Sequence, residues 1–291
     1  MKHFRLIAKA IILALLLVGS QLIAPRPAMI PSAPSDLPAE SVSIPTTKDD
    51  FVRGWWIQGT SDKRSVLLLH GIRSNRLSML GRARLLWAHG YSVLLLDLQR
   101  HGESPGEAIT FGWRESVGVA AARNWMKHRQ PGAKVGVIGV SLGGASVLLG
   151  EVPCGFDAVV LEAVYTNIHR AINNRLSMRL GMLGPLFTPL LEWQLQPRLG
   201  LEPEALNPAG HISRIGSPVF IVAGGRDQHT HLDESQAMYA SAKEPKALWV
   251  LPDAIHEDFY ARNPKEYALQ VVGFLNRYLA SSPREGSWSL E

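Results

Sequence analysis

Short apolar runs alternate with longer segments of helical spacing along most of the chain. The apolar runs are continuous, not alternating, and cover residues 65–69, 92–96, 134–138, 158–161, 219–223 and 247–251. Strands buried on both faces of a parallel sheet have this pattern. The intervening segments 78–89, 113–128, 142–150, 233–242 and 264–279 carry apolar residues at helical spacing. The alternation predicts an α/β fold with a mostly parallel, doubly wound sheet.

Two segments depart from this alternation. Residues 53–58 (RGWWIQ) predict an antiparallel strand ahead of the parallel ones, with Trp55 and Trp56 on opposite faces. Residues from about 165 to 215 are rich in Leu, Met, Arg and Pro, and we expect a helical insertion there. Because ligands bind beyond the carboxyl ends of parallel strands, this insertion is placed to form a lid.

The amino terminus is first basic and then apolar. Lys2, Arg5 and Lys9 come before or at the edge of the apolar run 10–24, which would be about 22 Å long as a helix. Both a cleaved signal peptide and a retained membrane anchor have this order, and both export the rest of the chain because the cationic end stays in the cytoplasm. We expect a domain outside the cytoplasm, tethered to a bacterial inner membrane if the segment is retained, and periplasmic or secreted if it is cleaved.

The remaining boundaries follow from composition. Six prolines between residues 25 and 48 predict an extended linker, which leaves a folded region of the size of one α/β domain at 49–281 and a tail at 282–291. The chain is 46% hydrophobic and 19% charged, as globular proteins are. Its net charge is +5, and three of its cations lie in the first nine residues, so the body offers no basic surface for nucleic acid. The ten histidines are scattered without metal-ligand spacing, and we expect no metal.

The strongest chemical signal is the pentapeptide Gly139-Val140-Ser141-Leu142-Gly143. It has the pattern G-x-S-x-G and lies directly between a predicted strand and a predicted helix. Such a turn strains the serine backbone, which small neighbours permit, and exposes the hydroxyl at the start of a helix. We therefore predict that Ser141 is a nucleophile. The same glycines leave no separate glycine-rich loop for phosphate.

A serine nucleophile needs a general base and an acid that orients it, and in this fold the order is serine, acid, histidine. Asp227 follows the predicted strand 219–223, and His256 follows the next strand. We assign the orienting role to Asp227 and the base to His256. The competing side chains are Glu162, Asp97, Asp253 and Asp258 among the acids, and His229 and His231 among the histidines. We expect Glu162 to pack or hydrogen bond beside the nucleophile strand, and Asp97 to brace the turn that it begins.

The loop after the strand 65–69 reads His70-Gly71-Ile72-Arg73. A loop in this position supplies one backbone N–H to the oxyanion, and the residue after the nucleophile supplies the other. We assign these donors to Ile72 and Leu142. His70 is expected to be buried and structural.

These motifs together resemble the α/β-hydrolase family: His70-Gly71, DLQRHGES, GVSLGG around Ser141, GGRD around Asp227, and His256. Within the family the chain is similar to bacterial serine hydrolases of the BEM46-like and serine-aminopeptidase-like groups. The resemblance covers roughly residues 53–279 and implies a Ser141, Asp227 and His256 triad and an acyl-enzyme formed without a cofactor, and we read the insertion as a short helical lid on this fold. Two features depart from the family pattern. The turn before His256 is not glycine-rich, and Arg73 and Arg76 follow His70-Gly71, where they either contact an anionic group or face solvent.

The sequence thus predicts a carboxylesterase-like serine hydrolase that acts on a small acyl substrate. A peptidase or amidase with the same triad is the alternative enzyme, and a catalytically silent binding protein of the same fold is the alternative from another class. The Leu and Met content of the insertion favours an apolar acyl group, and hence an ester over a peptide.

Overall fold

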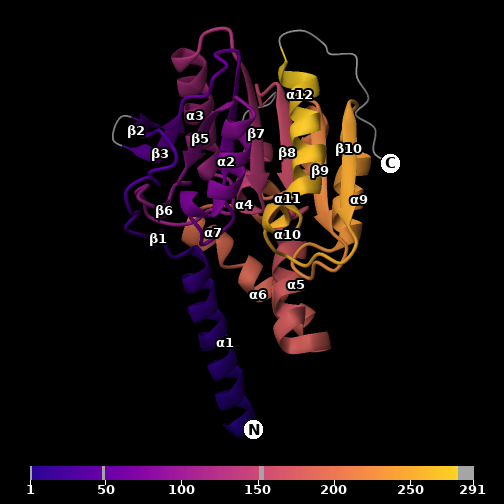
Figure 1. The fold of residues 1–291 in the computed structure, drawn as a ribbon. Coiled ribbons are helices and arrows are strands. Elements are labelled where there is room, and N and C mark those ends of the chain that lie inside the picture. The colour runs from indigo at the N-terminus through magenta and orange to yellow at the C-terminus, as the bar shows by residue number, and fades with distance from the viewer. Residues whose placement is uncertain (1, 48–49, 151–153, 281–291) are drawn as a thin grey trace.

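The computed structural model describes residues 2–47, 50–150 and 154–280, and a central sheet of eight strands organises the chain (Figure 1). The strand order is β10-β9-β8-β7-β4-β5-β3-β2. The first six of these are parallel, and β3 and β2 are antiparallel additions at one edge. The bounds are β2 Ala39–Pro45, β3 Phe51–Ile57, β4 Arg64–Leu69, β5 Ser92–Leu96, β7 Lys134–Val140, β8 Ala158–Glu162, β9 Val219–Gly224 and β10 Lys246–Leu251. All six predicted parallel strands are confirmed.

Helices cover both faces of the sheet, and the sheet separates the core into two apolar clusters. One cluster packs α3 (Glu115–Arg129), α4 (Leu142–Leu148) and α9 (Leu232–Ser241) on the sheet. The other packs α2 (Leu80–Ala88), α11 (Pro264–Tyr267), a π-helical turn (Ala268–Val272) and α12 (Gly273–Leu279) on the opposite face. Successive strand residues alternate between the clusters, and Trp55 and Trp56 point to opposite faces as predicted. The sheet is therefore doubly wound.

The helical insertion lies between β8 and β9, at the carboxyl ends of the strands (Figure 1). It contains α5 (Ile168–Leu180), a 3₁₀ segment (Gly181–Phe187), α6 (Thr188–Glu192), α7 (Leu195–Leu199), a 3₁₀ turn (Pro203–Ala205), α8 (Pro208–His211) and a 3₁₀ turn (Ile212–Arg214). The predicted helical character of this segment is confirmed. Shorter elements outside it are a 3₁₀ turn (Arg76–Met79) and α10 (Phe259–Arg262).

The predicted linker 25–48 is wrong as a uniform tether, and the sheet begins before residue 49. Ala39–Pro45 forms β2, the edge strand, in antiparallel register with β3. Val42 and Ile44 are buried whereas Ser41 and Ser43 are exposed, which is the two-residue period of a half-buried strand. The high proline content of residues 25–48 led to the prediction of a linker. Pro45 is nevertheless compatible with β2, because it lies at the end of an edge strand, where it removes no hydrogen bond of the sheet. Arg26–Pro27 (β1) also pairs, with His101–Gly102 (β6). The predicted tail 282–291 lies outside the described residues.

The amino-terminal segment forms α1 (Lys2–Ile23), which projects from the domain beside the lid (Figure 1). Its carboxyl-terminal end contacts α6, and Leu15 belongs to the core. Within the described ranges, no helix reaches the combination of length and hydropathy that crossing a membrane requires.

Candidate active site

Ser141 occupies a sharp turn between β7 and α4. Its backbone has φ 49° and ψ −108°, a region that side chains rarely adopt. The Ser141 N–H donates to the Glu162 carbonyl at 2.8 Å, which holds the turn against the end of β8. Positions 139 and 143 have no room for a side chain. A Cβ added at Gly139 would lie 2.5 Å from the Gly144 nitrogen, and one added at Gly143 would lie 2.6 Å from the Leu69 backbone oxygen. The local sequence thus creates a strained serine at a helix start.

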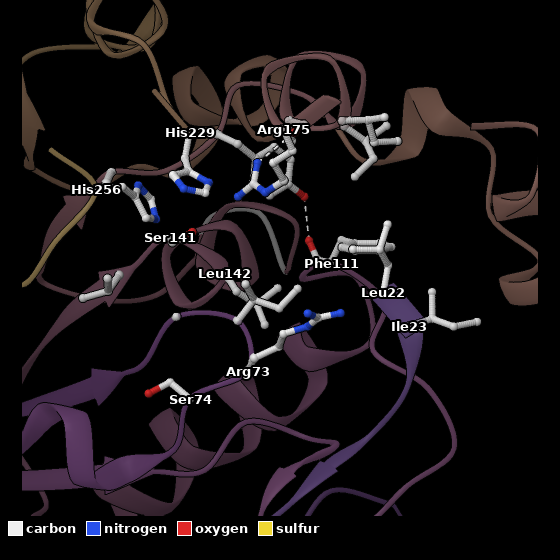
Figure 2. A pocket seen from close by; sticks show the side chains of 18 of the residues that line it. Leu22, Ile23, Arg73, Ser74, Phe111, Ser141, Leu142, Arg175, His229 and His256 are labelled. Carbon is white, nitrogen blue, oxygen red and sulfur yellow. Dashed lines mark hydrogen bonds between the residues drawn. The ribbon is translucent and has the colours of Figure 1, made fainter. Parts of the chain in front are cut away.

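Asp227 and His256 meet at the same edge of the sheet. Asp227 follows β9, and its Oδ2 accepts from His256 Nδ1 at 2.7 Å. Its other oxygen accepts the N–H groups of His229 at 2.7 Å and Thr230 at 3.0 Å. Burial opposes ionisation of Asp227, but the hydrogen bond and charge of His256 together with the two N–H groups lower its pKa. Because the Asp227 carboxylate binds Nδ1 of His256, the other ring nitrogen, Nε2, is left for the pocket. Both His256 and Ser141 line this pocket (Figure 2).

The residues that carry the two predicted oxyanion donors both belong to backbone next to Ser141. A Cβ added at Gly71 would be 3.8 Å from the Ser141 Cβ, so the loop after β4 runs alongside the serine. Ile72, the next residue, lines the pocket, as does Leu142. The Leu142 N–H belongs to the first turn of α4, where helical N–H groups have no partner within the helix. Both N–H groups are thus carried by backbone that borders the serine.

His70 fixes the loop that carries Ile72. It is fully buried, and its Nε2 accepts the Leu98 N–H at 3.1 Å. The ring proton must therefore be on Nδ1, which lies 2.7 Å from the Gly71 carbonyl and donates to it. Burial, with His101 nearby, lowers the pKa of His70 to about 4. The structural role predicted for His70 is confirmed.

We expect the free energy of unfolding to fall as the pH drops from 6.5 toward 4. The folded-state pKa of His70, about 4, is below its ordinary value of 6.5, so the unfolded chain takes up the proton first. The stability is present above pH 6.5 and is lost toward pH 4, by about 3 kcal/mol for this single site. Urea titrations of the wild type and of His70→Gln at several pH values measure the difference. The exposed His128→Gln is the control, and equal pH dependence in all three proteins would contradict the prediction.

A buried ion-pair network joins the end of β8 to the His256 loop. Arg82 Nη2 lies 2.6 Å from Glu162 Oε2, and its Nη1 lies 2.7 Å from Asp258 Oδ1. Tyr267 donates to Glu162 and accepts from Arg82 Nε at 3.1 Å. Burial of Arg82 disfavours its charge, but Glu162, Tyr267 and Asp258 raise its pKa well above the usual value. Glu162 therefore has the hydrogen-bonding role expected for it, and Asp258 is engaged away from His256.

The other competing acids are also engaged elsewhere. Asp97 is fully buried and accepts from the backbone of Arg76 at 2.7 Å and of Glu103 at 2.9 Å, so its predicted bracing role is confirmed. Arg76 is itself buried in an ion pair with Asp97, so it neither faces solvent nor reaches a ligand, contrary to both expectations. Asp253 forms an exposed pair with Arg226 at 2.9 Å.

His229 lies closer to the site than its sequence position indicated. Its ring packs against that of His256 with the centroids 4.8 Å apart and the ring planes tilted by 40°, and both rings line the pocket (Figure 2). Burial and the charge of Arg175 lower the pKa of His229 to about 4, which keeps it neutral beside His256. His231 instead forms the amino-terminal cap of α9. The signal for His229 was only its proximity to Asp227 in the sequence.

The pocket beside Ser141 has a volume of about 810 Å³. Its walls are largely apolar and come from the lid, from Phe111 and Tyr165, and from α1; the lid side chains include Ile168, Ala171, Ile172, Leu176, Leu191 and Leu195. Tyr165 donates to the Phe111 carbonyl at 2.6 Å, which joins the lid base to the domain (Figure 2). Arg73 lines the pocket and donates to the Gln21 carbonyl at 2.8 Å. The contribution of α1 to this wall was not predicted from the sequence.

A parallel sheet with a strained serine between strand and helix defines the α/β-hydrolase fold. Residues 66–270 match the model of the alpha/beta hydrolase family, and this chain belongs to that family. The Bacillus subtilis protein YqkD, itself uncharacterised, is 23% identical over 240 residues, which are 80% of this chain and 78% of YqkD. Human protein ABHD12B is 24% identical over 253 residues, 81% of this chain and 68% of that protein.

Solved structures resemble the chain over most of its length. The esterase Pf2001 of Pyrococcus furiosus has a TM-score of 0.72 and 27% identity, and the match covers 88% of this chain and all of the esterase. The acylaminoacyl peptidase of Pyrococcus horikoshii has a TM-score of 0.63 at 16% identity, covering 86% of this chain and 43% of that one. The second likeness is one of fold alone.

Proposed function

We propose that this α/β hydrolase is a carboxylesterase-like serine hydrolase, which cleaves esters of apolar acyl groups. The observation that carries the proposal is the convergence at one apolar pocket of Ser141, held at φ 49°, and His256, hydrogen-bonded to Asp227 at 2.7 Å. A strained serine costs stability and persists where the surrounding fold imposes it, which is typical of catalytic turns.

In the proposed mechanism the Ser141 hydroxyl attacks the ester carbonyl while His256 Nε2 accepts its proton. Asp227 holds the imidazole by Nδ1 and stabilises its positive charge. The N–H groups of Ile72 and Leu142 receive the oxyanion, and protonated His256 then gives its proton to the leaving alcohol. Water, deprotonated by His256, then attacks the acyl carbon, the bond to Ser141 Oγ breaks, and His256 returns the proton to that oxygen as the acid leaves. Each step uses side chains or backbone N–H groups of this chain and water, and no cofactor enters it.

Esters are favoured over amides by two facts. Most of the pocket wall is apolar, as an acyl chain requires, although Arg175, Arg179 and Arg198 also line it. The Pyrococcus furiosus structure that is 27% identical is an esterase, whereas the peptidase is similar in fold alone.

The test is labelling of the full chain with a fluorophosphonate, followed by hydrolysis of matched p-nitrophenyl esters and p-nitroanilides. We expect labelling and hydrolysis of esters, with esters of medium or long acyl chains preferred to acetate. Preference for anilides would establish an amidase instead. A folded protein that neither labels nor turns over any substrate would contradict the proposal and favour the catalytically silent binding protein.

We further propose that the enzyme works outside the cytoplasm, held at a membrane by α1. Arg5 and Lys9 precede an apolar stretch in which some side chains are exposed to solvent. Leu13 and Leu17 are each 59% exposed. Exposed leucines next to cationic residues favour binding to a lipid surface, where the leucines are buried and the cations contact anionic headgroups. The same labelling, performed on separated fractions, tests this proposal, since a labelled band confined to the soluble cytoplasmic fraction would contradict it.

A further inference from the structure

The last turns of α1 form part of the substrate pocket. Val18, Gly19, Leu22 and Ile23 line the same pocket as Ser141 and His256. They are spaced three or four residues apart or adjacent, so they share one face of the helix. Figure 2 places Leu22 and Ile23 on the side of the pocket that carries Phe111 and Arg73. The segment that precedes the domain in sequence therefore forms part of the wall of the candidate active-site pocket.

The lid binds the backbone of this helix from one side. Gln194 Nε2 donates to the Leu15 carbonyl at 3.2 Å, and Arg198 Nη2 donates to the Leu16 carbonyl at 3.1 Å. At Gly19 the contact is so close that an added Cβ would lie 2.2 Å from Gln194 Oε1. Leu15 is 7% exposed and belongs to the core of the hydrolase domain. This face of α1 is packed as an interior helix is packed.

The hydrolase domain also satisfies the end of the helix. Carbonyl groups in the last turn of a helix have no partner within it and need donors from elsewhere. The Gln21 carbonyl accepts from Arg73, which lies in the loop that carries Ile72, at 2.8 Å. The Ile23 carbonyl accepts the Ile109 N–H at 2.8 Å. Two separate loops of the domain thus cap α1 at the pocket.

We propose that α1 is a retained wall of the acyl pocket and that Leu22 determines which acyl chains fit. This inference rests on the proposed esterase function. Leu22 presents an apolar side chain to the cavity. A signal peptidase requires small residues at its cleavage site, and cleavage after Gly19-Ser20 would remove Val18, Gly19 and the carbonyls that Gln194 and Arg198 hold. Loss of this wall would open the apolar cavity to water. On this proposal residues 1–24 are retained, as the anchor interpretation expects, and are not removed as a leader.

The test uses the full chain with Leu22→Trp and Leu22→Ala, and p-nitrophenyl esters from acetate to laurate. A larger side chain fills part of the pocket, so we expect Leu22→Trp to lower kcat/KM for laurate relative to acetate by about tenfold or more. The smaller Leu22→Ala shifts the optimum toward longer chains. Leu13→Trp and Leu13→Ala are the matched controls, because Leu13 is on the same helix, is 59% exposed and lies outside the pocket; these variants keep the wild-type optimum.

Fluorophosphonate labelling separates failure of this inference from failure of the proposed function. If the wild type and the Leu22 variants label equally and their chain-length optimum is unchanged, the inference is overturned and the esterase proposal stands. If Leu22→Trp does not fold, Leu22→Ala carries the test alone. The intact mass of the labelled enzyme from its membranes is expected to include residues 1–24, and a mature chain that begins at Gln21 or later would overturn the inference. If the folded wild type is not labelled, the proposed esterase function is contradicted, and the inference that rests on it falls with it.

Discussion

Replacement of Ser141 by alanine is expected to abolish fluorophosphonate labelling and to lower kcat for ester hydrolysis by about 10⁴- to 10⁶-fold. Alanine has no oxygen to attack the carbonyl, while the His256–Asp227 pair and both backbone donors stay in place. The small residual rate then comes from substrate binding and oxyanion stabilisation. Active-site labelling and steady-state kinetics on the same preparation measure the loss. Unchanged labelling in Ser141→Ala would place the nucleophile elsewhere.

Ser146 provides the control for this substitution. It lies on α4, the helix that follows Ser141, but its hydroxyl donates to the Leu142 carbonyl at 2.7 Å and it does not line the site pocket. Ser146→Ala should therefore keep its labelling.

The strain at Ser141 has a separate signature in stability. Glycine adopts φ 49° without the steric cost that any side chain meets there, so Ser141→Gly should be more stable than Ser141→Ala by about 1 kcal/mol although both are inactive. Chemical denaturation of the two variants measures this difference. Equal stability would show that the turn is not strained in solution.

Replacement of Arg82 by methionine is expected to lower the free energy of unfolding by about 3–5 kcal/mol. The substitution keeps the apolar stem of the side chain and removes the charge that balances Glu162, which is 1% exposed. A buried carboxylate without its partner must stay charged at high cost or take up a proton. Asp258, two residues after His256, loses the same partner, so kcat should also fall. Urea denaturation and ester hydrolysis measure the two effects.

Arg84→Met is the matched control for Arg82→Met. Arg84 is on the same helix and pairs with Asp36 at 2.6 Å, but both side chains are about half exposed, and such pairs contribute about 0–1 kcal/mol. The double variant Arg82→Met with Glu162→Gln should regain part of the lost stability, because the amide leaves no buried charge. Equal losses in the two single variants would show that burial of the Arg82 pair does not matter.

The choice among the acids shows where sequence reasoning stopped. Asp97, Glu162 and Asp227 all stand at or just beyond the carboxyl ends of parallel strands, and that position alone does not distinguish them. The structure separates them by their partners: Arg76 binds Asp97, Arg82 binds Glu162, and His256 binds Asp227. Arg82 and Glu162 are 80 residues apart in sequence, so no local pattern could pair them.

The sequence by itself determined the parallel strands, the helices between them, the serine turn and the order of the site residues. These depend on residue periodicity and on glycines within a few positions, which act locally whatever the rest of the chain does. Only the tertiary structure decided that Ala39–Pro45 is an edge strand and that one face of α1 borders the pocket. The run 10–24 has no polar side when it is drawn as a helix, so its sequence does not indicate which face packs against the domain. Its packing is chosen by contacts such as that between Leu15 and Gln194, which are 179 residues apart.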